Sequence, residues 1–258
     1  MKTNQIAAQL YTLREYLKTE QEFEEALKKL KEIGYTAIQL SGLGFSNIKF
    51  IKDTADKYGM NICATHTSFD RITQEFDDVV KEHKAWGCKY VGIGSMPPHY
   101  RENAEGYSRF AKEASEIGRK FKLNGLTLVY HNHSFEFEKF DGLTGMDILF
   151  NESDSEALDF EIDTYWVAIG GANPIYWINK VKGRMGIVHF KDLAIQKGTQ
   201  IMAEVGEGNL NWTGIIKACD TTGVIWAAVE QDVCQRDPFD SLRISFNNVK
   251  NMIEGDLI

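Results

Sequence analysis

The stretch FEEALKKLKEIGYTAIQL, residues 23–40, contains the unit that decides the fold. Apolar side chains recur in it with the spacing of one helix face, at Phe23, Ala26, Leu27, Leu30 and Ile33. Gly34 follows at once, and glycine is the residue that most often ends a helix. The apolar run at residues 35–40 then has the length and composition of a buried strand.

The same order of helix, glycine or turn, and short apolar strand repeats along the chain. Helices are predicted at residues 23–33, 48–58, 79–86, about 107–123 and about 239–253. Strands are predicted at residues 5–10, 35–40, 61–66, 89–93, 126–131, 158–163, 186–190 and 225–230. Strand starts recur at roughly 25 to 40 residues, which is the period of a βα unit rather than of a hairpin. We therefore predict a (β/α)8 TIM barrel of the α/β class, with residues 1–258 in one domain.

An open, doubly wound sheet is the alternative architecture for such a pattern. That fold normally carries a glycine-rich turn after its first strand. Here the first strand runs into the segment QLYTLR at residues 9–14, which contains no glycine. The closed barrel is the better prediction.

Composition and charge restrict the partners. The net charge is -8, which argues against binding to nucleic acid or to an anionic membrane surface. No apolar run is long enough to span a bilayer, and charged residues follow the N-terminal segment closely, unlike in a secretory signal. The four cysteines are scattered without a CxxC pair. We expect a reduced, cytoplasmic protein.

Polar side chains gather where the predicted strands end. In a TIM barrel the C-terminal ends of the strands build the active site. Ten candidates stand at such ends: Gln9, Gln39, His66, His131, His133, Asp163, His189, Lys191, Glu230 and Asp232. Two other histidines, His83 and His99, are predicted to be surface residues.

An acid or an imidazole at the end of a buried strand is costly unless it is paired or ligates an ion. Imidazole and carboxylate together suit Zn, Mn, Fe or Co better than Mg or Ca. We therefore expect one divalent metal ion, with Mn, Zn, Co or Mg as candidates, at a site that includes Asp163, His189 and Glu230. The alternative is that each residue only caps a loop or forms an isolated salt bridge.

Five segments carry a resemblance to a known family. They are LVYHNHSFEF (128–137), LDFEIDTYW (158–166), IVHFKDL (187–193), VGEGNLNW (205–212) and AAVEQD (227–232). In order and spacing they are similar to the xylose-isomerase-like barrel superfamily, which includes sugar isomerases and epimerases, inosose dehydratases and apurinic-site endonucleases. The N-terminal half agrees in pattern only, through QLYTLR and the strand end at His66.

The resemblance implies metal ligands from strands 5, 6, 7 and 8, usually Glu, Asp, His and Glu. Asp163, His189 and Glu230 match the last three, but His131 stands where the family has glutamate. Either His131 ligates the metal, or the site has three protein ligands, with water and His133 or Glu136 nearby.

The chemistry that such a site suits is proton abstraction next to a carbonyl, through an enediolate. Glu230 would be the base, His131 or His133 the acid on the other side, and Lys191 would stabilise the oxyanion. For a small-molecule sugar substrate we predict further contacts from Gln9, Gln39, His66, Glu136 and Trp166. The leading prediction is a metal-dependent sugar isomerase or epimerase.

Three alternatives stay open. The same site suits a dehydratase or a 3-keto-glycoside lyase if the enolate expels a β-substituent. A non-catalytic sugar-binding or partner subunit is consistent with the missing glutamate. A nuclease would need more metal ligands and a basic face. Since relatives are often dimers or tetramers, a homo-oligomer is consistent with the resemblance.

Overall fold

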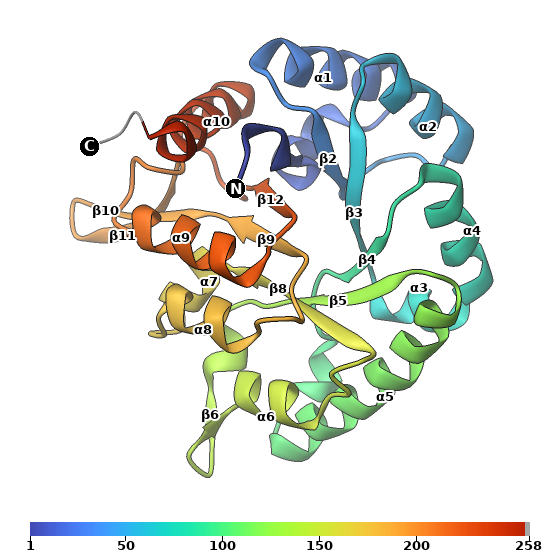
Figure 1. Ribbon diagram of the computed structural model, residues 1–258, viewed down its shortest axis with the longest axis vertical. Coiled ribbons are helices and arrows are strands. Elements are labelled where there is room, and N and C mark those ends of the chain that lie inside the picture. The colour runs from blue at the N-terminus through green and yellow to red at the C-terminus, as the bar shows by residue number, and fades with distance from the viewer. Residues whose placement is uncertain (256–258) are drawn as a thin grey trace.

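In the computed structural model, which describes residues 1–255, eight parallel strands close into a barrel (Figure 1). Their order around the barrel is β1-β12-β9-β8-β5-β4-β3-β2. The strands are β1 (Ile6–Gln9), β2 (Ala37–Leu40), β3 (Asn61–Thr67), β4 (Tyr90–Ile93), β5 (Thr127–His131), β8 (Leu158–Asp163), β9 (Ile187–Phe190) and β12 (Trp226–Val229). Every predicted strand is confirmed, and so is the TIM-barrel fold.

Helices surround the barrel on its outside (Figure 1). They are α1 (Glu20–Ile33), α2 (Ile48–Lys57), α3 (Phe69–Gln74), α4 (Phe76–Trp86), α5 (Ala104–Leu123), α6 (Gly145–Glu152), α7 (Thr164–Ile169), α8 (Pro174–Lys180), α9 (Trp212–Thr222) and α10 (Pro238–Glu254). Short 3-10 helices cover Thr3–Gln5, Leu10–Tyr16, Pro98–Tyr100 and Phe135–Phe137. Among residues 1–255, no helix is long and apolar enough to cross a membrane.

Helix α1 shows how local sequence sets these boundaries. The Thr19 hydroxyl accepts a hydrogen bond from the Glu22 amide, and the Glu22 carboxylate accepts one from the Thr19 amide, so the first turn is capped from both sides. The helix ends at Gly34, whose φ is +123°. A Cβ there would lie 2.7 Å from the Phe246 ring of α10, so both the backbone conformation and the packing require glycine.

Two antiparallel hairpins interrupt the βα repeat, and the sequence analysis predicted neither. One joins β6 (Lys139–Phe140) to β7 (Leu143–Thr144), and the other joins β10 (Asp192–Gln196) to β11 (Thr199–Ala203). The second hairpin begins directly after Lys191, at the mouth of the barrel. The hairpin therefore starts beside a predicted site residue.

Apolar side chains fill the barrel interior below the mouth. A cluster separate from the main core is formed by Ala7, Ala37, Cys63, Ala64, Tyr90, Val129, Ile187 and Ala228. These residues come from seven of the barrel strands, which identifies the cluster as the packed inside of the barrel.

The prediction for His83 is wrong, because its ring is buried between α4 and β3. Its Nδ1 donates to the Val79 carbonyl oxygen at 2.7 Å, and its Nε2 lies 2.8 Å from the Thr65 hydroxyl. Both ring nitrogens are therefore satisfied inside the protein. His99 is exposed, as predicted.

Candidate metal centre

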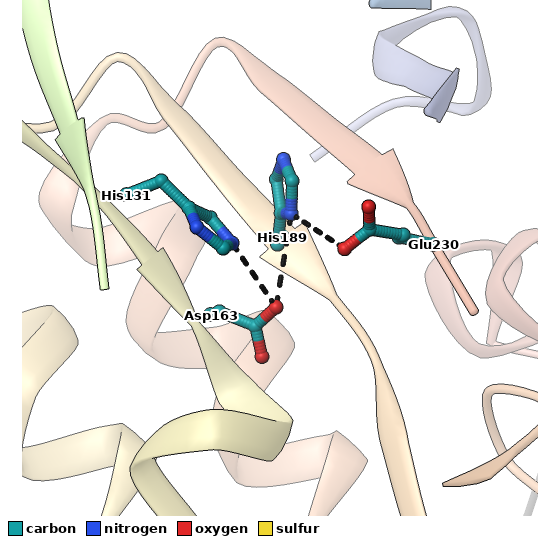
Figure 2. A group of neighbouring side chains, drawn as sticks. All are labelled: His131, Asp163, His189 and Glu230. Carbon is teal, nitrogen blue, oxygen red and sulfur yellow. Dashed lines mark hydrogen bonds and ion pairs between the residues drawn. The ribbon is translucent and has the colours of Figure 1, made fainter. Parts of the chain in front are cut away.

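Four neighbouring strands bring His131, Asp163, His189 and Glu230 together (Figure 2). His131 and Asp163 are the last residues of β5 and β8, His189 lies in β9, and Glu230 directly follows β12. All four are buried, and one ligand atom from each lies within 4.8 Å of the others. Such convergence follows from the barrel, since the C-terminal ends of adjacent strands meet at one rim.

Distances inside this group are those of a compact ligand set. The Asp163 Oδ2 atom lies 3.3 Å from His131 Nε2 and 3.7 Å from His189 Nδ1. The Glu230 Oε2 atom lies 3.2 Å from His189 Nδ1. These are the contacts drawn as dashed lines in Figure 2.

The outward nitrogens of the two imidazoles are already bound. His131 Nδ1 lies 3.1 Å from the Gly94 carbonyl oxygen. His189 Nε2 lies 2.8 Å from the Gln39 side-chain oxygen and 3.1 Å from the Glu161 carboxylate. A carbonyl or carboxylate oxygen only accepts, so these nitrogens carry the N–H. In a neutral ring the inward nitrogen is then a lone pair that faces carboxylate oxygens. Burial would lower the pKa of His189, but Glu161 and Glu230 raise it well above its usual range, so without an ion this ring holds a second proton that a bound cation would replace. Lone pairs on imidazole nitrogens that face carboxylate oxygens form a set of acceptor atoms that suits a divalent cation. A histidine that ligates a metal typically donates its other ring N–H to a carbonyl or carboxylate oxygen, as both rings do here.

Asp163 is held so that one oxygen stays directed at this centre. Its Oδ1 caps α7 by accepting from the Trp166 amide at 2.9 Å. Its own amide donates to the Asn132 side chain at 3.0 Å. Only Oδ2 faces the two imidazoles.

Lys191 adds a buried positive charge beside the centre. Its ammonium lies 3.0 Å from Glu230 Oε2 and 3.7 Å from Asp163 Oδ2, and it also contacts Asp232. Burial alone would lower the pKa of Lys191, but the carboxylates of Glu230, Asp163 and Asp232 raise it, so the side chain is an ammonium at neutral pH.

The two oxygens of Glu230 differ in their surroundings. Oε2 contacts His189 and Lys191, whereas Oε1 makes no hydrogen bond to any residue of the described range 1–255. Glu230 also lines a pocket of about 460 Å³ at the barrel mouth. One oxygen is held, and the other is open to that pocket.

Seven of the predicted site residues line this pocket: His66, His131, His133, Trp166, Lys191, Glu230 and Asp232. His133 lies between the rings of Phe135 and Trp166. Burial and the neighbouring His131 lower the pKa of His133 to about 3, so the ring is neutral at physiological pH.

Three predicted substrate contacts lie outside the pocket lining. Glu136 is buried, and its carboxylate accepts from the Tyr130 hydroxyl at 2.5 Å and from the His133 amide at 2.9 Å. Gln9 accepts from the Tyr11 amide, and Gln39 is bound to Glu161 and His189. These contacts make Glu136 and Gln39 supports of the site, and their role toward a substrate stays a prediction.

Glu161 is the site residue that the sequence analysis missed. It lies two positions before Asp163 in β8, fully buried, and its carboxylate meets His66, His189 and Gln39. Burial would raise the pKa of Glu161, but the neighbouring His189 and His66 lower it well below its usual range. Residues two apart in a strand share a face, so the spacing to Asp163 was the available signal.

A family model described as a xylose isomerase-like TIM barrel matches residues 27–238. The chain belongs to this family. It is 22% identical to an inosose dehydratase of Clostridium beijerinckii over 86% of both chains.

Solved structures agree with this placement. A sugar phosphate isomerase/epimerase from Parabacteroides distasonis superimposes with a TM-score of 0.81 at 21% identity, over 98% of this chain and 96% of that one. A xylose isomerase-like TIM barrel protein from Mycobacterium smegmatis, in complex with magnesium, superimposes with a TM-score of 0.77 at 13% identity over the full length of both chains. At these identities the structural likeness establishes the fold.

Proposed function

We propose that this protein is a divalent-metal-dependent isomerase or epimerase of a small sugar or keto-sugar. Two neighbouring features support the proposal. One is a buried group of side chains able to hold a cation, and the other is a carboxylate, Glu230, with one oxygen open to the pocket. His131, Asp163, His189 and Glu230 would hold the ion. Two imidazoles with two carboxylates support Mn, Zn or Co, and Mg stays a candidate. When bound, the ion would polarise a substrate carbonyl and stabilise negative charge that develops on its oxygen.

The residues around the pocket supply the proton chemistry. Glu230 Oε1 would take the proton from the carbon next to the carbonyl, while Oε2 is held by the Lys191 ammonium. The Lys191 ammonium would stabilise the developing oxyanion. His133 lies among the other lining residues and would exchange a hydrogen bond or a proton with a substrate hydroxyl. Trp166, beside His133, would form a wall of the sugar site.

Elimination is the second candidate, and the likeness to an inosose dehydratase over most of both chains favours it. The first step is the same proton abstraction by Glu230. The electron pair left on carbon then expels a β-hydroxyl or β-alkoxyl group, which must receive a proton as it leaves. The products therefore separate this reaction from isomerisation.

The test is solvent proton exchange. Manganese-loaded protein is incubated in heavy water with a panel of ketoses, aldoses and 3-keto-glucosides, and the products are followed by NMR. The expected result is deuterium at a carbon next to the carbonyl, and its loss in Glu230→Gln. A new sugar identifies an isomerase or epimerase, and an unsaturated product identifies a dehydratase or lyase. Metal-loaded protein that exchanges no candidate overturns the proposal in favour of a binding or partner role.

A further inference from the structure

We propose that Glu161 is a positioning residue that fixes the tautomers of two histidines, His189 in the metal centre and His66 in the pocket wall. One carboxylate oxygen, Oε2, lies 2.7 Å from His66 Nε2. The other, Oε1, lies 3.1 Å from His189 Nε2 and accepts from the Gln39 amide nitrogen at 2.8 Å. That bond turns the Gln39 side-chain oxygen toward His189 Nε2, at 2.8 Å, so Glu161 holds the His189 N–H both directly and through Gln39. The role of Glu161 toward His189 rests on the proposed metal centre. The role of Glu161 toward His66 does not depend on a metal.

The hydrogen-bonding capacity of a carboxylate sets the direction of each contact. An ionised carboxylate has no proton to donate, so every nitrogen that contacts Glu161 must supply the hydrogen. The Nε2 atoms of both histidines therefore carry N–H, and Nδ1 carries the lone pair in neutral His66 and in His189 when it ligates an ion. For His189, that lone pair faces Asp163 Oδ2 and Glu230 Oε2, where the ion would be held.

The His66 lone pair faces the pocket. A Cβ built on Gly94 would lie 3.1 Å from His66 Nδ1, and Gly94 and His66 both line the pocket. His66 Nδ1 makes no hydrogen bond to any other residue of the described part of the chain. With Glu161 holding Nε2–H, His66 presents an acceptor to a substrate hydroxyl. The absence of a side chain at Gly94 keeps that acceptor accessible.

A second cation site is the alternative for this group, since His66, Glu161 and His189 also bring ligand atoms within 4.8 Å of one another. The pairing of hydrogen-bond donors and acceptors around Glu161 argues against a second cation site. Each oxygen of Glu161 meets N–H donors from His66, His189 or Gln39, so the group is satisfied without an ion. In the outer group, His131 and His189 turn their inward nitrogens to carboxylate oxygens, so either a proton on an imidazole or a cation must lie between them. Glu161 therefore acts through the histidines rather than on an ion.

The substitution that tests this role is Glu161→Gln. Glutamine keeps the size of the side chain and one carbonyl acceptor, but its NH2 group must face one of the nitrogens that Glu161 now accepts from. At the Oε2 position the NH2 group meets His66, which has to become an acceptor at Nε2 and carry its proton on Nδ1. At the Oε1 position it meets the Gln39 amide, which has to turn and present its own NH2 group to His189, so that His189 becomes the acceptor. The matched control is Asp159→Asn, which removes another partly buried carboxylate from the same strand, two residues earlier and without contact to either histidine.

The first readout is ¹⁵N NMR of the imidazole rings. In wild-type protein without metal, His66 is expected as the Nε2–H tautomer, and in the Zn²⁺-loaded protein His189 is expected with N–H on Nε2. In Glu161→Gln one of the two rings should change tautomer, and in Asp159→Asn neither should. Wild-type His66 with its proton on Nδ1 would overturn the proposal without recourse to any variant.

The second readout is Zn²⁺ affinity, measured by competition with a chromophoric chelator. Loss of an outer partner of a ligating histidine typically weakens binding about 10–100-fold, and that is the loss expected for Glu161→Gln. Folded Glu161→Gln with unchanged tautomers and affinity within about twofold of wild type overturns the inference. Wild-type protein that binds no Zn²⁺ refutes the metal centre instead, and His66 in the metal-free protein still decides the role of Glu161.

Discussion

Asp192 is expected to be the most sensitive carboxylate outside the metal centre, because its side chain organises the loop after the β10–β11 hairpin. The residue is buried and directly follows Lys191. Its Oδ2 accepts from the amides of Gly206 and Gly208 and from the Trp212 indole N–H. Its Oδ1 accepts from the amides of Leu193 and Leu210. Five donors thus depend on one carboxylate.

The substitution Asp192→Asn keeps the shape but replaces one oxygen with an NH2 group. The best orientation turns the amide oxygen toward the three donors at Oδ2 and leaves the NH2 group against the two amides at Oδ1. A buried N–H without a partner costs about 1–3 kcal/mol, so two of them predict a loss of about 2–6 kcal/mol in the free energy of unfolding. Such a loss is a large part of the ~5–15 kcal/mol typical of a domain.

Urea unfolding at pH 7, followed by circular dichroism, measures this loss. Hydrogen exchange should also accelerate at the amides of Gly206 and Gly208. Asp220→Asn is the control, because its carboxylate is 69% exposed and contacts only the N-terminus among residues 1–255, so we expect a change within about 0.5 kcal/mol. A loss below about 1 kcal/mol in Asp192→Asn would refute the reasoning that the carboxylate holds the loop together.

Three further outcomes are expected. Burial lowers the pKa of His83 to about 4, below the ~6.5 of an unfolded histidine. The neutral His83 ring therefore contributes its full stability above pH 6.5, and the free energy of unfolding falls by up to about 3 kcal/mol as pH drops toward 4. Urea titrations of wild type and His83→Gln at pH 7 and pH 5 measure this loss, and equal pH dependence in both proteins would contradict it. Manganese at about 100 times its dissociation constant should stabilise the wild-type fold by about 2.7 kcal/mol and so raise its melting temperature. At the same manganese concentration, His131→Ala should lose most of this rise in melting temperature. An undiminished rise in the variant would show that His131 is not a ligand. Gly118→Ala should destabilise the fold by about 2 kcal/mol or more, although alanine has the higher helix propensity, because the new Cβ would lie 2.0 Å from the Ala157 carbonyl oxygen. A melting temperature at or above that of wild type would argue against this packing of α5.

The barrel was predictable because its signals are local. Helix faces, glycine ends such as Gly34 and continuous apolar strands each depend on a few neighbouring residues. The hairpin of β10 and β11 escaped prediction, because residues 192–203 mix polar and apolar side chains and are held in place by the distant contact of Gln200 with Tyr165. No local period indicates such an element.

The candidate site was predictable where a reactive side chain ends a strand, as at His131 and Asp163. Glu161 was missed because it lies inside a strand, where only the two-residue spacing to Asp163 placed it on the inner face. His83 was misread for a related reason. It lies four residues after Val79, on the face of α4 that packs against the barrel, so the helical period could have placed it inside.

The most direct measurement is anomalous diffraction at the manganese absorption edge from crystals soaked in Mn²⁺. One strong peak per chain is expected, bounded by His131 Nε2, Asp163 Oδ2, His189 Nδ1 and Glu230 Oε2. A peak between His66 and Glu161, or none at these four atoms at saturating Mn²⁺, would contradict the assignment of the metal centre.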